Sequence, residues 1–263
     1  MPKVSVILTT YNRPELVKKT IDSILNQTFQ DFELIVVDNC SNYDFLQVIN
    51  AFNDKRIIPF QKNNHGIIAK NRNYGISKAN GAFLAFCDDD DIWEPNKLEI
   101  QINFIYRNKL ENNQFVLYTN CIEVNDDFSK NTNIKEIKSI NDLIYSSQIY
   151  FSTSMISNIS LSERFNELPV FIAVEDYLFW MSLKATNYNF FLIKEHLVKI
   201  HIDKSSMSLK KYGLNHVRSI LVLAYVYLNF KNLKINNFSF GISIIQQSIK
   251  FIIKKAIKFI SKN

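Results

Sequence analysis

Residues 3–37 read KVSVILTTYNRPELVKKTIDSILNQTFQDFELIVV, and this stretch decides the fold class. Its two ends, residues 3–9 and 32–37, are apolar runs rich in β-branched side chains, typical of strands buried on both faces of a parallel sheet. Between them, apolar residues recur at helical spacing, with Asn12 as the expected helix cap and Pro14 in the first turn. The stretch therefore predicts a strand, a helix and a second, parallel strand.

The same alternation continues along the chain. Further strands are expected at residues 57–60, 82–87, 115–124, 149–156 and 190–200. Further helices are expected at residues 45–52, 66–79, from 95 onward, and at 174–185. Such alternation predicts an α/β fold with a Rossmann-like, mostly parallel sheet flanked by helices and joined by right-handed crossovers. The polar residues 126–141 are expected to form a loop.

The composition indicates a cytoplasmic globular protein with an uneven charge distribution. Its 263 residues are 47% hydrophobic and 21% charged, which is enough for one sizeable core. Three cysteines without C-x-x-C spacing argue against a disulfide framework or a thiolate zinc site, and the first residues lack a signal-peptide layout. Residues 204–263 contain eleven Lys and Arg and no Asp or Glu, whereas the rest of the chain contains twenty basic and twenty-five acidic residues.

We expect residues 213–263 to form a basic amphipathic helical tail on a catalytic domain of residues 1–212. From Ile245 to Ile260, isoleucines recur at helical spacing and the lysines lie largely off that stripe. We favour docking of the tail on an anionic membrane surface over packing against the domain. The apolar residues 219–230 are too few to span a bilayer. Because the lysines alternate with isoleucine more than with aromatic residues, nucleic acid is not an expected partner.

Four consecutive acids, Asp88–Asp91, follow the strand expected at residues 82–87. Ligands of an open parallel sheet bind beyond the carboxyl ends of its strands, where residues 9–12 and 38–39 are also expected. Carboxylates are hard oxygen ligands suited to Mg²⁺ or Mn²⁺, and four adjacent ones repel each other unless a cation is near. The run alone is as typical of a solvated acidic turn as of a metal site, and its position after a buried strand favours the metal.

The remaining polar candidates have ordinary explanations when each is considered alone. Glu175 and Asp176 at a helix start fit the helix dipole, although either carboxylate could be a general base. His201 follows an apolar strand and would more often be structural than a ligand. Cys87 has no evident base beside it and is expected to be a small buried side chain.

The order of these motifs resembles that of family 2 glycosyltransferases, which have the GT-A fold. The matching residues, dense to about 110 and thinner to about 208, are residues 4–14, 23–28, 32–38, Gly66, Ala69, Arg72, Asn73, Gly75, Gly81, Phe86, Asp88–Asp91, Trp93, Glu175, Asp176, Trp180 and His201. The resemblance implies a nucleotide-binding part of about residues 1–110 and an acceptor part of about residues 111–212.

The resemblance also implies a role for individual residues. The donor-binding residues would be Thr9, Tyr11, Asp38, Asn39, Arg72, Asp88 and Asp89. The metal ion, Mn²⁺ or Mg²⁺, would be held by Asp90, Asp88 and His201, and Asp176 would be the catalytic base. Many relatives have an aspartate at the position of Asn39, and that aspartate recognises the uracil base. An amide can donate and accept, so UDP is favoured and dTDP stays open.

The implied activity is that of an inverting, metal-dependent transferase. It would move a hexosyl or N-acetylhexosaminyl group from a nucleotide sugar to a glycan or lipid-linked acceptor in surface polysaccharide or glycoconjugate synthesis. The protein would be peripheral on the inner face of the plasma membrane. One alternative is a sugar-nucleotide nucleotidyltransferase, which is disfavoured because residues 10–14 are not a Gly-rich basic loop. The other, a non-catalytic membrane-associated binding protein, is disfavoured by the retained acids.

Overall fold

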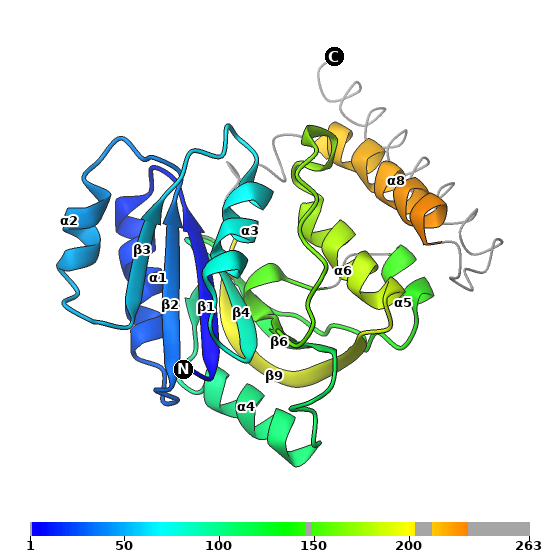
Figure 1. Ribbon diagram of the computed structural model, residues 1–263, viewed down its shortest axis with the longest axis horizontal. Coiled ribbons are helices and arrows are strands. Elements are labelled where there is room, and N and C mark those ends of the chain that lie inside the picture. The colour runs from blue at the N-terminus through cyan, green and yellow to red at the C-terminus, as the bar shows by residue number, and fades with distance from the viewer. Residues whose placement is uncertain (1, 146–148, 203–211, 231–263) are drawn as a thin grey trace.

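The computed structural model of the chain describes residues 2–145, 149–202 and 212–230, and Figure 1 shows a central sheet with helices on both sides. Its described strands are β1 (Val4–Thr10), β2 (Phe32–Asp38), β3 (Ile57–Gln61), β4 (Phe83–Asp88), β5 (Ile92–Trp93), β6 (Phe115–Val124), β7 (Ser129–Asn131), β8 (Met155–Ser157) and β9 (Asn189–His201). Its described helices are α1 (Pro14–Leu25), α2 (Phe45–Asn50), α3 (Ile68–Lys78), α4 (Lys97–Arg107), α5 (Ile140–Tyr145), α6 (Glu175–Ala185) and α8 (Tyr212–Asn229), with 3-10 turns η1 (Phe151–Thr153) and η2 (Pro169–Phe171).

The first half of the sheet is parallel, as the sequence predicts. Strand β1 pairs in parallel with β2 and β4, and β2 pairs in parallel with β3. Every residue of β1 and β2 is buried, because helices cover both faces of these strands. Ile7 of β1 packs in the same cluster as Ala69 and Ile76 of α3, whereas Val6 packs in the opposite cluster with Val17 of α1.

The second half of the sheet mixes both pairing directions. The strand order is β3-β2-β1-β4-β8-β6-β9-β5, with β7 paired to β6. Strand β8 is antiparallel to β4 and β6, and β9 is parallel to β6 and antiparallel to β5. The long strand β9 curves along the sheet in Figure 1, and its residues Val198 and Lys199 pair with Trp93 and Ile92 of β5, just after the acid run.

Three local predictions were wrong. Residues 126–141, expected as a loop, contain β7, whose three exposed polar residues carry no apolar pattern. Residues 149–156, expected as a strand, form η1 and only the start of β8. Asn12 does not cap α1: the cap position is Arg13, and the Asn12 side chain instead accepts a hydrogen bond from the backbone of Asn42 at 2.8 Å.

The C-terminal helix α8 packs against α6 and η2. Its Val222, Leu223 and Val226 are buried in the same apolar cluster as the helix α6, and Tyr225 meets Phe171 edge-on at 5.4 Å between ring centroids. The isoleucine stripe predicted at residues 245–260 lies outside the described residues. Within the described ranges, every helix is too short or too polar to cross a lipid bilayer.

Candidate active site

The carboxyl ends of β1, β2 and β4 meet at one edge of the sheet. In the strand register Thr10 lies beside Asp38, and Thr9 lies beside Asp88. The hydroxyl of Thr10 donates a hydrogen bond to Asp89 at 2.7 Å, which ties the end of β1 directly to the acid run. The meeting of these segments follows from the parallel sheet, as the sequence predicts.

A cavity of about 370 Å³ opens at this edge. Its lining residues are Thr9, Thr10, Tyr11, Arg13, Asn39, Asn64, Gly66, Ile68, Asn71 and Asp89. Four of the expected donor-binding residues, Thr9, Tyr11, Asn39 and Asp89, are therefore brought together. The Thr9 hydroxyl and the Asn71 amide oxygen are buried without a hydrogen-bond partner among the described residues, so both are available to a polar ligand.

Asp38 lies behind this cavity. It is fully buried and outside the cavity lining. Its carboxylate accepts hydrogen bonds from the Ser41 hydroxyl, from the Ser41 backbone N–H at 2.9 Å and from Gln61 Nε2 at 3.1 Å. Asn39, the next residue, accepts from the backbone of Asn64 at 2.7 Å. Asp38 therefore holds the loop that places Asn39 in the cavity wall.

Arg13 is the counter-ion of two members of the acid run. One guanidinium nitrogen lies 3.0 Å from Asp89 and 2.9 Å from Asp90. Burial, followed by the negative charges of Asp88 and Asp89, raises the pKa of Asp90 to about 6. Burial also raises the pKa of Asp89, although the hydrogen bond from Thr10 lowers it in part. Arg13 was not among the residues expected at the site, although it stands inside the matching motif.

Asp91 is buried and holds together segments on which the site is built. It accepts hydrogen bonds from the Ser152 hydroxyl and, at 3.1 Å, from the backbone N–H of His201. Ser152 also accepts a hydrogen bond from the backbone N–H of Asp88 at 2.9 Å. Burial, then the charges of Asp88 and Asp90, raises the pKa of Asp91 well above its usual range. Asp91 thereby joins the β4–β5 turn to η1 and to the end of β9.

The expected metal-binding residues Asp88 and Asp90 belong to one turn, and His201 reaches that turn through its backbone N–H, which donates to Asp91. In the described parts of the chain, no three His, Cys, Asp or Glu side chains converge as a ligand set. Asp88 and Asp90 are paired instead with Arg72 and Arg13. Both aspartates remain partly exposed, at 34% and 19% of the side chain. Two partly exposed carboxylates, one of which has its pKa raised by burial and then by the charge of the other, have the chemistry that a hard divalent cation needs.

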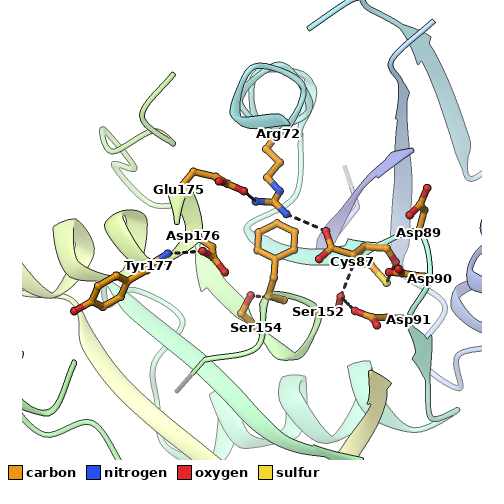
Figure 2. Close-up of polar contacts among 12 residues, drawn as sticks. Arg72, Cys87, Asp89, Asp90, Asp91, Ser152, Ser154, Glu175, Asp176 and Tyr177 are labelled. Atoms are coloured by element: carbon orange, nitrogen blue, oxygen red, sulfur yellow. Dashed lines mark hydrogen bonds and ion pairs between the residues drawn. The ribbon is translucent and has the colours of Figure 1, made fainter. Parts of the chain in front are cut away.

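The second pair of acids, Glu175 and Asp176, begins α6 on the other side of Arg72. Figure 2 shows both carboxylates on one side of the guanidinium and the acid run on the other. Asp176 is partly buried and accepts a hydrogen bond from the Tyr177 backbone N–H at 2.7 Å. Burial, then the charge of Glu175, raises the pKa of Asp176 to about 7, against the opposing effect of Arg72. A carboxylate with this pKa is suited to accept a proton near neutral pH.

Cys87 is not a nucleophile in this site. It is fully buried, and burial, then the charges of Asp91 and Asp88, raises the pKa of its thiol well above the ordinary value. Behind it, Lys97 is fully buried over the Trp93 ring at 3.8 Å and donates to Gln101 at 2.9 Å. Burial lowers the pKa of Lys97 to about 7.

Comparison with known proteins identifies the family. The sequence profile of Glycosyl transferase family 2 matches residues 5–163, more than half of the chain. An uncharacterized glycosyltransferase of Rickettsia bellii is 33% identical over 240 residues, which are 86% of this chain and 33% of that protein. The chain thus spans about a third of this longer relative. The enzyme UDP-Glc:alpha-D-GlcNAc-diphosphoundecaprenol beta-1,3-glucosyltransferase WfgD of Escherichia coli is 31% identical over 211 residues, covering 80% of this chain and 81% of the enzyme.

Solved structures agree on the architecture. The crystal structure of S. aureus TarS 1–349 in complex with UDP-GlcNAc superposes with a TM-score of 0.72 at 22% identity, covering 93% of this chain and 71% of the TarS chain. The curved sheet with its flanking helices is therefore the GT-A fold that the resemblance implies. On its profile match and its relatives, this chain belongs to glycosyl transferase family 2.

Proposed function

We propose that the protein is an inverting glycosyltransferase that moves a sugar from a nucleoside diphosphate to a hydroxyl group of a glycan or lipid-linked acceptor. One observation carries this proposal. Asp176, a carboxyl group whose pKa is raised to about 7, follows Glu175, which Arg72 joins to Asp88 of the acid run, and Asp89 of the same run lines a cavity of about 370 Å³. A proton acceptor beside a phosphate-binding site is what this transfer requires.

The cavity at the ends of β1 and β2 is the proposed nucleoside site. The unpartnered Thr9 hydroxyl and Asn71 carbonyl offer an acceptor or donor to a base or ribose. Tyr11, 54% exposed at the cavity, presents a ring that can pack against a base. We favour a UDP sugar, with dTDP second, because WfgD is named for UDP-Glc and the TarS crystal contains UDP-GlcNAc.

Asp88 and Asp90 are the proposed ligands of a Mn²⁺ or Mg²⁺ ion, with His201 as a third. Such an ion supplies positive charge that stabilises the departing diphosphate. Asp89 keeps its hydrogen bond from Thr10 and its ion pair with Arg13, and it lines the cavity proposed for the donor. The chain's own contribution to the chemistry is then the proton transfer.

Asp176 is the proposed general base. As the acceptor hydroxyl attacks the anomeric carbon, its proton passes to the Asp176 carboxylate while the bond from that carbon to the diphosphate oxygen breaks. A single in-line displacement of this kind inverts the anomeric centre. The placement of Asp176 at the start of α6, across Arg72 from Asp88, separates the base from the diphosphate-binding acids.

The proposed acceptor is a glycan or lipid-linked glycan at a membrane surface. WfgD is named for a diphosphoundecaprenol-linked acceptor, and residues 204–263 of this chain contain eleven basic and no acidic residues. We expect the tail to hold the protein peripherally on anionic lipids. Deletion of the residues after Gly241 should abolish flotation with vesicles containing phosphatidylserine, whereas unchanged flotation would remove the tail from this role.

The activity is tested by donor screening followed by transfer. Thermal unfolding is measured with UDP, dTDP and GDP sugars in the presence of Mn²⁺ or Mg²⁺, because a ligand that binds the native state raises the melting temperature. The stabilising donor is then assayed for sugar transfer or hydrolysis. No stabilisation or turnover with any donor would contradict the proposal. Pyrophosphate release from a nucleoside triphosphate and a sugar phosphate would identify a nucleotidyltransferase instead.

A further inference from the structure

The Arg72 guanidinium joins two acids that lie far apart in the sequence. One terminal nitrogen lies 2.9 Å from Glu175 and the other lies 2.9 Å from Asp88. Its centre lies 3.7 Å from the ring centroid of Phe151. Figure 2 shows the side chain reaching down from α3 to Glu175 at one end of its fork. A single planar group therefore connects the end of β4 with the start of α6.

Burial makes this connection obligatory for Glu175. The side chains of Arg72 and Glu175 are only 5% and 8% exposed, whereas Asp88 is 34% exposed. The second oxygen of Glu175 is buried without a hydrogen-bond partner among the described residues. The charge of Glu175 is thus offset by Arg72, since a buried carboxylate without a counter-ion is strongly disfavoured.

We propose that Arg72 and Glu175 are positioning residues of the transfer reaction: their ion pair holds the first turn of α6 so that Asp176 faces the acid run, and Arg72 offsets the negative charge that Glu175 places beside the base. This inference rests on the proposed function, because it concerns the base assigned there. Arg72 then acts on Asp176 and Asp88 rather than as the donor contact that the resemblance implies.

The two partners have opposite electrostatic effects on Asp176. The charged groups that act on it are Glu175 of α6, Arg72 of α3 and Asp88 of β4. Beyond the effect of burial, Glu175 raises the pKa of Asp176 and Arg72 lowers it. Removing one partner should therefore move the titration of Asp176 in one direction, and removing the other should move it in the opposite direction.

The test measures the titration of Asp176 without any substrate. The protein is labelled with ¹³C at aspartate carboxyl carbons, and the Asp176 signal is identified by its loss in Asp176→Asn. Glu175→Gln, which preserves the shape of the side chain, should lower the titration midpoint by about one pH unit, a tenfold change in the ionised fraction. Arg72→Met should raise it by a similar amount, and the double variant should lie between them.

Arg56→Met is the matched control. Arg56 also forms an ion pair, with a guanidinium nitrogen 2.6 Å from the Asp54 carboxylate, and its guanidinium centre lies 4.6 Å from the ring centroid of Phe32. It lies away from the site. It should leave the Asp176 midpoint unchanged. Midpoints that do not move, or that move in the same direction for Glu175→Gln and Arg72→Met, would overturn the inference. If Arg72→Met does not fold, the sign of the Glu175→Gln shift alone decides.

Kinetics separate this inference from the proposed function. Glu175→Gln leaves the Arg72–Asp88 contact in place, so the KM for the donor should stay within about twofold while the acidic limb of the kcat profile follows the NMR midpoint. A large rise in donor KM with an unmoved profile would make Glu175 a binding residue and refute its positioning role. Opposite midpoint shifts without transfer from any donor would refute the proposed function and leave the electrostatic coupling intact.

Discussion

Replacing Asp176 with asparagine should stop sugar transfer and, at the same time, stabilise the protein at alkaline pH. The introduced amide keeps the size of the side chain but can neither accept the acceptor's proton nor carry a charge. In the native protein, burial and then the neighbouring charge of Glu175 raise the pKa of Asp176 from 3.8 to about 7. A raised pKa in a carboxyl group means that the folded state disfavours the charged form.

The sign and size of the stability change follow from this shift. Between about pH 4 and pH 7, Asp176 binds more protons in the folded than in the unfolded protein, so its contribution to stability falls as pH rises through this window. The full shift of about 3 units corresponds to about 4 kcal/mol above pH 7, at about 1.4 kcal/mol per unit. Asp176→Asn removes this penalty. Its advantage over wild type should increase by about 3 kcal/mol between pH 5 and pH 8.

Urea unfolding at 25 °C, followed by tryptophan fluorescence at pH 5 and pH 8, measures this difference. Asp54→Asn is the control of opposite sign, because its hydrogen bond to Arg56 lowers the pKa of Asp54. That variant should lose stability at pH 8 and little at low pH, where Asp54 is protonated. A stability gain of Asp176→Asn that is equal at both pH values would refute the raised pKa. Transfer at a near wild-type rate would place the base elsewhere.

Three further predictions concern the acid run and the sheet. Because the pKa of Asp90 is raised to about 6, the thermal stabilisation by Mn²⁺ with donor should weaken below about pH 6 and be lost in Asp90→Ala. Arg13→Ala removes a positive charge 2.9 Å from Asp90, so the pH at which Mn²⁺ stabilisation is lost should rise. Gly81→Ala would put a Cβ 2.5 Å from the Ser5 backbone nitrogen, so urea unfolding should show that the free energy of unfolding falls by about 1–3 kcal/mol or more. Gly66→Ala is the comparison: there φ is +79° and the space is open, and the loss should be about 1 kcal/mol.

The parallel half of the fold was predictable because its strands are buried on both faces. Almost wholly apolar runs such as residues 3–9 have few other stable arrangements, and alternation with helices then dictates parallel pairing. The elements that were missed have no such pattern. Strand β7 is polar and exposed, and η1 is held by contacts such as the hydrogen bond from Ser152 to Asp91. Contacts of this kind depend on residues far apart in the chain, which periodicity does not report.

The acid run shows the same limit at the level of single residues. The sequence predicts a cluster of four carboxylates at the sheet edge, and the structure places this cluster beside the end of β1. It does not predict that each has a different environment. Asp91 binds inward to Ser152 and the His201 backbone, Asp88 meets Arg72, and Asp89 and Asp90 share Arg13. These partners come from distant segments, so adjacent and chemically identical residues acquire different functions.

The charge balance of the site argues for joint binding of cation and donor. Six carboxyl groups belong to the two acidic segments of the site, Asp88–Asp91 and Glu175–Asp176, and four of them, Asp88, Asp89, Asp90 and Glu175, form ion pairs with the guanidinium groups of Arg13 and Arg72. Burial first, and then the charge of the neighbouring carboxylates, raises the pKa of Asp90 to about 6 and that of Asp176 to about 7. A diphosphate alone would add to the excess, whereas a divalent cation would reduce it. Donor binding should therefore require the cation near neutral pH, and a donor that stabilised the protein equally with and without Mn²⁺ or Mg²⁺ would contradict this account.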